Sequence, residues 1–258
     1  MPIDAITTAG GLLLPLAVLV PFAGVLLGLV LGGRGAQRVA TVTIVAGLGI
    51  ALAVASAMLQ AGGPLVYLLG GWAPPLGIAL RADGLSVVMM VAVAIVIAGI
   101  GLYARGDFGT PPGTAEARAP LMYWLLLLAV WGSLNLVFLS GDLFTLYVAL
   151  ELLTFAGVPL VCLDGKGETL RAALRYLLYA LAGSVLYLLG VVLIYGECGT
   201  LDIAMLQGDA TTPVTGLLSF SPEDRPPVQL VFQSYHLMVA IGMGLIGLSL
   251  AGAFYAMR

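Results

Sequence analysis

The chain has 258 residues, of which 61% are apolar and only 9% are charged. Soluble globular proteins carry about 25% charged and ~45–50% apolar residues, so this composition excludes a water-soluble fold. At ~20 apolar residues per crossing, the length accommodates about seven or eight membrane helices. The sequence therefore predicts an integral membrane protein.

The residues that bind cofactors are scarce. One histidine, His236, and two cysteines, Cys162 and Cys198, exclude a bis-histidine haem, a four-cysteine iron–sulfur cluster and metal sites built from His/Cys clusters. No phosphate-binding loop motif occurs, and the net charge of −3 leaves no basic patch for nucleic acid. We therefore expect no cofactor, no metal site and no nucleic-acid partner. Any function must therefore come from a few charged groups set in lipid-buried helices.

Apolar runs of about 20 residues predict seven membrane spans. The predicted spans are 11–31, 39–59, 85–104, 120–139, 143–163, 172–195 and 237–257. The predicted fold class is all-α, a polytopic membrane helix bundle in a single domain over 1–258. The two long loops, 60–84 and 196–235, carry no run of amphipathic elements that could bury a core of their own.

The basic residues are divided unevenly between the connecting segments. The loops after spans one, three and five, together with the C-terminus, hold 8 of the 10 basic residues, and the remaining segments hold Arg81 and Arg225. The eight are Arg34, Arg38, Arg105, Arg118, Lys166, Arg171, Arg175 and Arg258. By the positive-inside rule, the N-terminus is expected outside and the C-terminus in the cytoplasm.

Glu151 is the strongest candidate functional residue. It follows Asp142, at the outer edge of span five, by nine residues, or about 13–14 Å at 1.5 Å per residue. That is close to the middle of a ~30 Å hydrocarbon core. Burial there disfavours the ionised carboxylate, whereas a nearby cation favours it. A group balanced between these effects can take up and release a proton; the alternative is a protonated carboxyl that only ties two helices together.

Arg175, one turn into span six and four residues after Arg171, is the second candidate. It either extends toward the interface, as long basic side chains do, or lines a polar path. At 100° per residue, Arg175, Tyr176, Tyr179, Gly183 and Tyr187 share a sector of about 120°. Their hydroxyl groups can support a chain of water, but packing with satisfied hydroxyls is the favoured interpretation for Tyr179 and Tyr187.

The remaining polar residues have simpler explanations. Asp142 and Asp83 precede spans five and three, where the helix dipole favours a carboxylate, and Asp142 is also a candidate proton acceptor. His236 is expected at the membrane interface. Cys162 and Cys198 fall near opposite membrane faces, beyond the ~7 Å Cα separation that a disulfide tolerates.

Three stretches resemble a known family. They are GGWAPPLGI at 70–78 continuing to RADGLS at 81–86, the span 142–163 with LELL around Glu151, and RAALRY at 171–176 with the turn GTL at 199–201. Together they resemble the antiporter-like membrane subunits shared by respiratory complex I and the Mrp-type multisubunit sodium/proton antiporters, in particular the D-type subunit. The likeness is good over about 67–206.

The resemblance implies proton movement, with sodium as the candidate exchanged ion, within a large complex of a bacterial-type inner membrane. In the family, the span-five glutamate and a basic residue on a neighbouring helix form a charge pair that gates proton transfer. Glu151 matches that glutamate, and Arg175 stands where lysine is common. Arginine does not deprotonate in proteins, so Arg175 is expected to modulate Glu151 rather than relay a proton.

Two departures shape the functional hypotheses. Family members run to about fourteen helices in two inverted halves, whereas seven are predicted here, and Ala251 stands where the span-seven lysine is expected. The resemblance therefore predicts a partner chain with second-half helices, or else a truncated or degenerate subunit. We favour an ion-translocating subunit. The alternatives are a non-conducting structural subunit and a subunit of a complex I-type NADH-quinone oxidoreductase.

Overall fold

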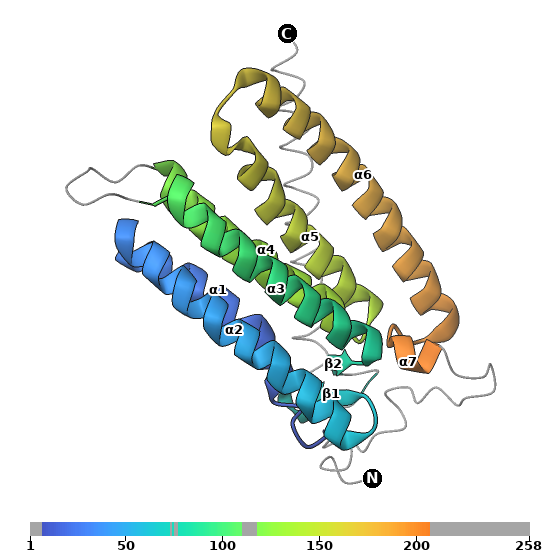
Figure 1. Ribbon diagram of the computed structural model, residues 1–258. Coiled ribbons are helices and arrows are strands. Elements are labelled where there is room, and N and C mark those ends of the chain that lie inside the picture. The colour runs from blue at the N-terminus through green and yellow to red at the C-terminus, as the bar shows by residue number, and fades with distance from the viewer. Residues whose placement is uncertain (1–6, 73, 75–76, 110–117, 207–258) are drawn as a thin grey trace. The chain divides into compact units, whose positions relative to one another are not determined.

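The computed structural model describes residues 7–72, 74, 77–109 and 118–206. The chain divides into two compact units, Met1–Thr212 and Pro213–Arg258, and the described residues all belong to the first. The prediction of one domain over 1–258 therefore stays a prediction. Six described helices are long and apolar enough to cross a membrane (Figure 1). They are α1 (Leu13–Leu31), α2 (Gly33–Ala61), α3 (Gly84–Asp107), α4 (Arg118–Leu139), α5 (Leu143–Val161) and α6 (Gly167–Cys198).

These helices confirm the first six predicted spans, and the all-α membrane bundle with them. The seventh predicted span, 237–257, lies outside the described residues, as do His236 and Ala251. A short helix, α7 (Ile203–Leu206), follows α6. The 3-10 turns η2 (Leu69–Gly71) and η3 (Cys162–Asp164) complete the helical elements of the described residues.

The loop predicted between spans two and three contains a β-hairpin. Strand β1 (Leu65–Leu68) pairs antiparallel with β2 (Ala79–Ala82), with Leu65 opposite Ala82. Isolated bridges then join Leu80 to Ser140 and Asp142 to Asp202. The hairpin thus ties the α4–α5 link and the α6–α7 link to one end of the bundle, which we call the hairpin end (Figure 1).

The opposite end of the bundle carries most of the positive charge. Consecutive spans alternate in direction, so the α1–α2, α3–α4 and α5–α6 links all lie there (Figure 1). Among the described residues, this basic end holds Arg34, Arg38, Arg105, Arg118, Lys166, Arg171 and Arg175, and the hairpin end holds Arg81. The segregation is what the positive-inside rule describes for cytoplasmic loops. The direction of the chain across the membrane stays a prediction.

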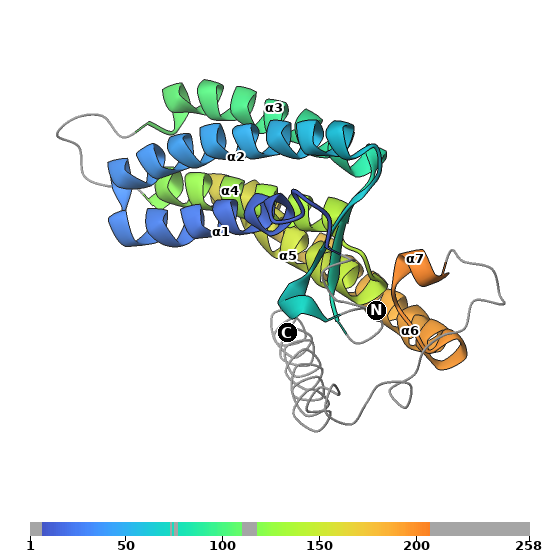
Figure 2. The same cartoon turned by 90° about the horizontal axis from the view of Figure 1, so that it is seen from below.

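Helices α1 to α4 pack closely because small residues face their neighbours (Figure 2). A Cβ added to Gly24 would lie 2.6 Å from the Thr43 hydroxyl, and one added to Gly47 would overlap the Trp131 ring. Membrane helices gain their association energy from such close backbone approach, because lipid supplies no hydrophobic driving force. The four helices are therefore the tightly packed part of the molecule.

A polar contact at the middle of α1 has a simple backbone cause. Pro21 lies inside α1 and has no N–H, so the carbonyl of Ala17, four residues earlier, loses its helical donor. The Asn135 side chain on α4 supplies the missing donor through Nδ2, 2.8 Å from the Ala17 oxygen. Asn135 is buried, and its amide replaces the hydrogen bond that proline removed.

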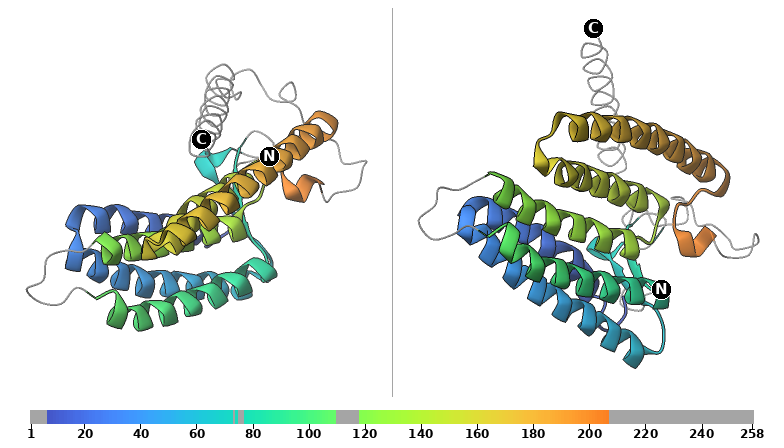
Figure 3. Two further views of the ribbon diagram at one scale, coloured as in Figure 1. Left: turned by 90° about the horizontal axis from the view of Figure 1, so that it is seen from above. Right: turned by 45° about the horizontal axis from the view of Figure 1, so that its top comes forward.

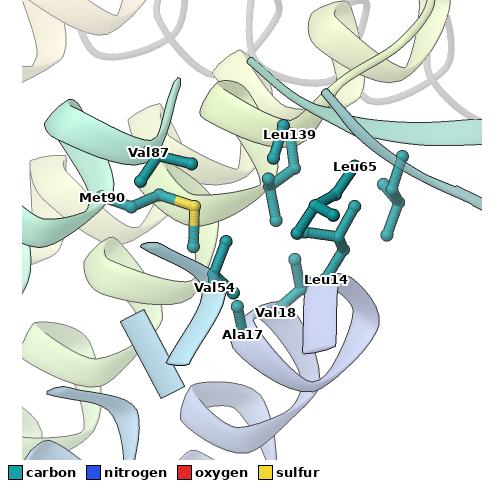
Figure 4. Packing of buried hydrophobic residues seen from close by; sticks show 10 residues of the cluster. Leu14, Ala17, Val18, Val54, Leu65, Val87, Met90 and Leu139 are labelled. Atoms are coloured by element: carbon teal, nitrogen blue, oxygen red, sulfur yellow. The ribbon is translucent and has the colours of Figure 1, made fainter. Parts of the chain in front are cut away.

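Buried side chains from the hairpin and four helices form the core at the hairpin end. Leu65 and Leu80 of the strands meet Leu14 of α1, Met90 of α3 and Leu139 of α4 (Figure 4). This cluster anchors the hairpin on the bundle. It also fixes the start of α5, because Ser140 is bridged to Leu80.

Helices α5 and α6 form the less covered side of the described unit. Helix α5 packs on α4, and α6 packs mainly on α5 (Figure 3). In α6 only Ala173 and Val191 are buried. The residues predicted to carry function all belong to this pair or to its first cap.

Candidate ion-translocation site

Helix α5 positions Glu151 at membrane depth. Its N-cap is Asp142, whose carboxylate accepts the Thr145 backbone N–H at 2.7 Å and satisfies one of the helix's unpaired donors. Glu151 follows nine residues later, next to the middle of the 19-residue helix. The structure thus gives Glu151 the central position that the sequence predicts.

Glu151 is held by a neutral partner on the neighbouring helix. The hydroxyl of Ser184, near the middle of α6, donates a hydrogen bond to Oε1 of Glu151. Both residues are partly buried. The ion pair recorded among the described residues is the exposed Lys166–Asp164 pair, 3.8 Å apart. Within the described part of the chain, Glu151 therefore has a hydrogen-bond donor that fixes its position and no cation that holds its charge.

The structure does not bring Arg175 to Glu151. Arg175 precedes Ser184 by nine residues, which is about 13–14 Å along the axis and two and a half helical turns. The Arg175 side chain therefore leaves the opposite face of α6 from Ser184, and it is exposed. A direct charge pair between these two residues is not formed in this arrangement, and their joint role stays a prediction.

The supporting residues on the basic half of α6 are largely exposed. Tyr179 is 80% exposed and Tyr176 is 61% exposed, and Arg171 is exposed as well. The face predicted from sequence holds Arg175, Tyr176, Tyr179, Gly183 and Tyr187, and Tyr187 stands at its edge nearest to Ser184. That face is not the one that carries Ser184.

Two tyrosines lie instead between Glu151 and the hairpin end. Tyr187 of α6 donates its hydroxyl to the Leu143 carbonyl at 3.1 Å, and its ring stacks on that of Tyr147, with centroids 6.1 Å apart and planes 15° apart. Tyr187 thus packs with its hydroxyl satisfied, as the sequence interpretation favoured. Sequence reasoning missed Ser184 and Tyr147. Tyr147 could have been found from sequence, because it lies four residues before Glu151 and therefore one turn away on the same helix face.

A groove opens between α5 and α6 on the basic half. It encloses about 710 Å³ and is lined mainly by apolar side chains of the two helices with Val130 of α4. Gly157 contributes to it, and a Cβ there would meet nothing within 4 Å. The lining residues nearest to Glu151 in sequence are Leu150, directly before it, and Leu153 and Thr154, two and three residues after it. It gives the basic half of the α5–α6 contact an open, apolar character.

Cys162 and Cys198 are free thiols. Cys162 precedes α6 and Cys198 ends it, so the two lie at opposite ends of a 32-residue helix. No group of three histidine, cysteine, aspartate or glutamate side chains suitable for a metal occurs within the part of the chain that the structure describes.

The first part of the chain is similar to antiporter subunits. It is 35% identical over 138 residues to the D-type Na(+)/H(+) antiporter subunit of Bacillus subtilis, which covers 54% of this chain and 27% of that protein. Among solved structures, a chain of the Mrp complex from Dietzia sp. DQ12-45-1b matches 80% of this chain and 38% of its own length, with TM-score 0.63 and 27% identity. A chain of the archaeal membrane-bound sulfane sulfur reductase matches 76% and 39%, with TM-score 0.66 and 25% identity.

The last part of the chain matches a different model. Residues 199–258 match the family of cytochrome bd terminal oxidase subunit I. This match begins at the residue after α6 and includes the whole of the seventh predicted span. Nothing in the antiporter resemblance anticipates it.

The chain spans about a quarter of the length of the curated antiporter subunits that it matches and about two fifths of the matched solved chains. The described part of the chain comprises six consecutive helices long enough to cross a membrane, a hairpin between the second and third, and a glutamate in the middle of the fifth. In sequence and in fold, the chain resembles the N-terminal half of the antiporter-like membrane subunits of Mrp-type and respiratory complexes.

Proposed function

We propose that the chain is a membrane subunit of a multisubunit cation/proton antiporter, in which Glu151 takes up and releases a proton. The position of Glu151 carries the proposal. It lies at the middle of α5, and its contact is the neutral hydroxyl of Ser184. The similarity to antiporter subunits supports the same function.

The energetic argument starts from the cost of a carboxylate at that depth. Placing one at the centre of a membrane helix costs about 2.5–3.5 kcal/mol on insertion scales. Protonation removes most of that cost, and a fixed cation would remove it by holding the charge. Glu151 contacts a hydroxyl, and no cation among the described residues offsets that cost by pairing with it. A relay requires a carboxyl that no fixed cation holds ionised.

The partners follow from the part of the relatives that this chain matches. Other membrane subunits would supply the remaining helices, including lysine-bearing helices of the second half. Such helices would also cover the largely exposed α6, because polar groups at membrane depth need protein or water around them. Arg175, on the face of α6 away from Glu151, would then act toward a neighbouring subunit. The complex would reside in a bacterial inner membrane, with protons and sodium as the exchanged ions.

The test is cation/proton exchange by the assembled complex carrying Glu151→Gln. Glutamine keeps an oxygen that accepts the Ser184 hydroxyl, so assembly should survive, but it cannot take up a proton. We expect exchange driven by a pH gradient to be lost in vesicles. The matched control is Glu168→Gln, which removes an exposed carboxylate from the first turn of α6, and it should exchange normally.

Unchanged exchange in a normally assembled Glu151→Gln complex would refute this function. That result, together with collapse of the complex when the chain is deleted, would establish the non-conducting structural alternative. Identification of the co-purified subunits by mass would separate an antiporter from a complex I-type assembly, because the latter brings flavin and iron–sulfur subunits.

A second candidate function rests on the match of residues 199–258 to terminal oxidase subunit I. On this candidate, the C-terminal segment joins the antiporter-like helices to a terminal oxidase. Haem chemistry would need ligands from this segment, and His236 is its one histidine, the residue type that commonly binds haem iron. His236 lies outside the described residues.

Visible absorption of the purified full chain and its partners tests the second candidate. A reduced-minus-oxidised haem spectrum, with oxidase subunits identified by mass, would support it. A colourless complex that contains only antiporter subunits would exclude it. The first candidate is unaffected by either result, because it depends on Glu151.

A further inference from the structure

The polar groups around Glu151 are distributed unequally along the contact between α5 and α6. Toward the basic end, the polar residue that α5 contributes is Thr154, and its hydroxyl is occupied by the Leu150 carbonyl at 3.0 Å. The groove there is lined mainly by apolar side chains. On its α6 side, the Thr169 hydroxyl is occupied by Asp164 at 2.9 Å, and Tyr176 is 61% exposed. Toward the hairpin end, the contact contains Tyr147, Tyr187 and the cap Asp142.

From this asymmetry we infer that protons reach Glu151 from the hairpin end, along a path formed by Asp142, Tyr187 and Tyr147. The inference rests on the proposed proton-carrying role of Glu151 and adds the side from which it is served. It also assigns Tyr147 and Tyr187 to that path as groups that pass the proton on.

The α5 side of the path is a ladder of residues one turn apart. Leu143, Tyr147 and Glu151 are spaced by four residues, which places them on one face of the helix with Cβ atoms about 5–6 Å apart. The Leu143 carbonyl accepts the Tyr187 hydroxyl, and Tyr147 lies one turn before Glu151. The ladder therefore runs without interruption from the first turn of α5 to Glu151.

The α6 side presents matching groups to that ladder. Tyr187 and Ser184 are three residues apart, so they also share one face. The first stacks on Tyr147, and the second donates to Glu151. The two helices thus enclose a seam of hydroxyl groups that is half-buried and ends on the carboxylate.

Asp142 lies at the mouth of this seam. It caps α5 at the hairpin end, next to Leu143, whose carbonyl accepts the Tyr187 hydroxyl. The nine residues from Asp142 to Glu151 correspond to about 13–14 Å. Tyr147 and Tyr187 lie along that length, and water molecules would bridge the gaps between the hydroxyls.

The transfer conserves both tyrosines. A proton bound at Asp142 passes to a bridging water. The Tyr187 hydroxyl turns from the Leu143 carbonyl to water, and each phenol oxygen accepts one proton as it releases its own to the next water. The last O–H bond forms on the Glu151 carboxylate, while Ser184 continues to hold Oε1. The tyrosines are unchanged after each passage, and the reverse sequence empties Glu151.

The first test measures proton flux in vesicles that contain the full chain with its co-purified subunits. The variants are Tyr147→Phe and Tyr187→Phe, which keep the stacked rings and remove only the hydroxyls. Loss of one hydrogen-bonding site in the chain of water should slow flux roughly tenfold. The matched control is Tyr195→Phe, on the same helix and in the same half of the membrane but 56% exposed, and it should conduct normally. Equal stability of the three variants establishes that packing is intact.

The second test asks which side of the membrane supplies Glu151. A hydrophobic carbodiimide reacts with protonated carboxyl groups, and peptide mass identifies the labelled residue. In sealed vesicles of known orientation, acidifying the hairpin side should increase labelling of Glu151, and acidifying the basic side should not.

Wild-type flux in both Tyr147→Phe and Tyr187→Phe would overturn the inference, as would labelling that follows the pH of the basic side. Equal slowing in Tyr195→Phe would also overturn it, because the effect would then not be specific to the seam. These failures differ from failure of the proposed function, in which Glu151→Gln itself exchanges cations normally.

Discussion

Replacement of Asn135 by leucine should destabilise the bundle through a single backbone carbonyl. The Ala17 carbonyl has no helical donor because Pro21 occupies the position of that donor. The Asn135 amide is the donor that reaches it, at 2.8 Å across the α1–α4 contact. Leucine keeps the branched shape of asparagine with a somewhat larger volume, so the main chemical change is the loss of this hydrogen bond.

The size of the effect follows from burial. Asn135 is only 4% exposed, so the carbonyl left behind has no water to replace the amide. Leaving a buried acceptor unpaired costs about 1–3 kcal/mol. Hydrogen bonds between membrane helices measure about 0.6 kcal/mol on average and at most about 1.7. We therefore expect Asn135→Leu to cost about 1–2 kcal/mol of unfolding free energy through this carbonyl.

The proline supplies a matched control. In Pro21→Ala, residue 21 regains its N–H and can bond the Ala17 carbonyl within α1. The carbonyl's share of the Asn135→Leu cost should then vanish in the Pro21→Ala background. The difference between the two costs isolates this carbonyl, because packing changes at residue 135 are common to both backgrounds.

Unfolding in mixed detergent micelles, followed by tryptophan fluorescence, measures all four variants of the cycle. Trp124 and Trp131 are both buried in α4, so their emission should change when the helices separate. An equal loss of stability in the two backgrounds would refute the reasoning, since it would mean that Asn135 stabilises the protein independently of Pro21.

Two further predictions concern other positions in the bundle. Asp83 is the exposed cap of α3, and hydrogen bonding from the Ser86 backbone N–H lowers its pKa. The contribution of Asp83 to stability is therefore present above the unfolded pKa of about 4. It is lost as the pH falls through the lower pKa of the folded state. Asp83→Asn should therefore flatten the acid side of the stability curve measured by thermal unfolding, and an unchanged acid slope would contradict it. Gly47→Ala places a Cβ against the Trp131 ring and should cost about 1–3 kcal/mol by overpacking. Gly49→Ala, whose Cβ meets nothing within 4 Å, should be neutral or slightly stabilising, and a similar melting temperature for the two variants would exclude the steric explanation.

The spans could be predicted because the membrane imposes a length on apolar runs. The helices extend beyond the predicted spans where polar residues continue the helix into the interface: α2 begins at Gly33 and α6 at Gly167. The hairpin was missed because its strands have only four residues each, too few for an alternating pattern in a Gly/Pro-rich loop. Its pairing is stabilised by the core at the hairpin end, which is a tertiary property.

Glu151 could be found from sequence because a carboxylate in an apolar span is unusual whatever surrounds it. Its partner could not, since the rotation of each helix about its axis is set by packing. The sequence places Arg175 one turn inside α6 but does not say which face meets α5. The contact of Ser184 with Glu151 settles that rotation and turns Arg175 to the other side.

The match of residues 199–258 to another family bears on how Ala251 is interpreted. Aligning 247–254 with the lysine-bearing span of antiporter subunits made Ala251 an argument against a proton path. That segment matches the model of another family, the terminal oxidase subunit. A lysine is expected there only if the segment is antiporter-like. The role proposed for Glu151 rests on α5 and α6, and the absence of a span-seven lysine from this chain is the reason why we expect a partner chain to supply one.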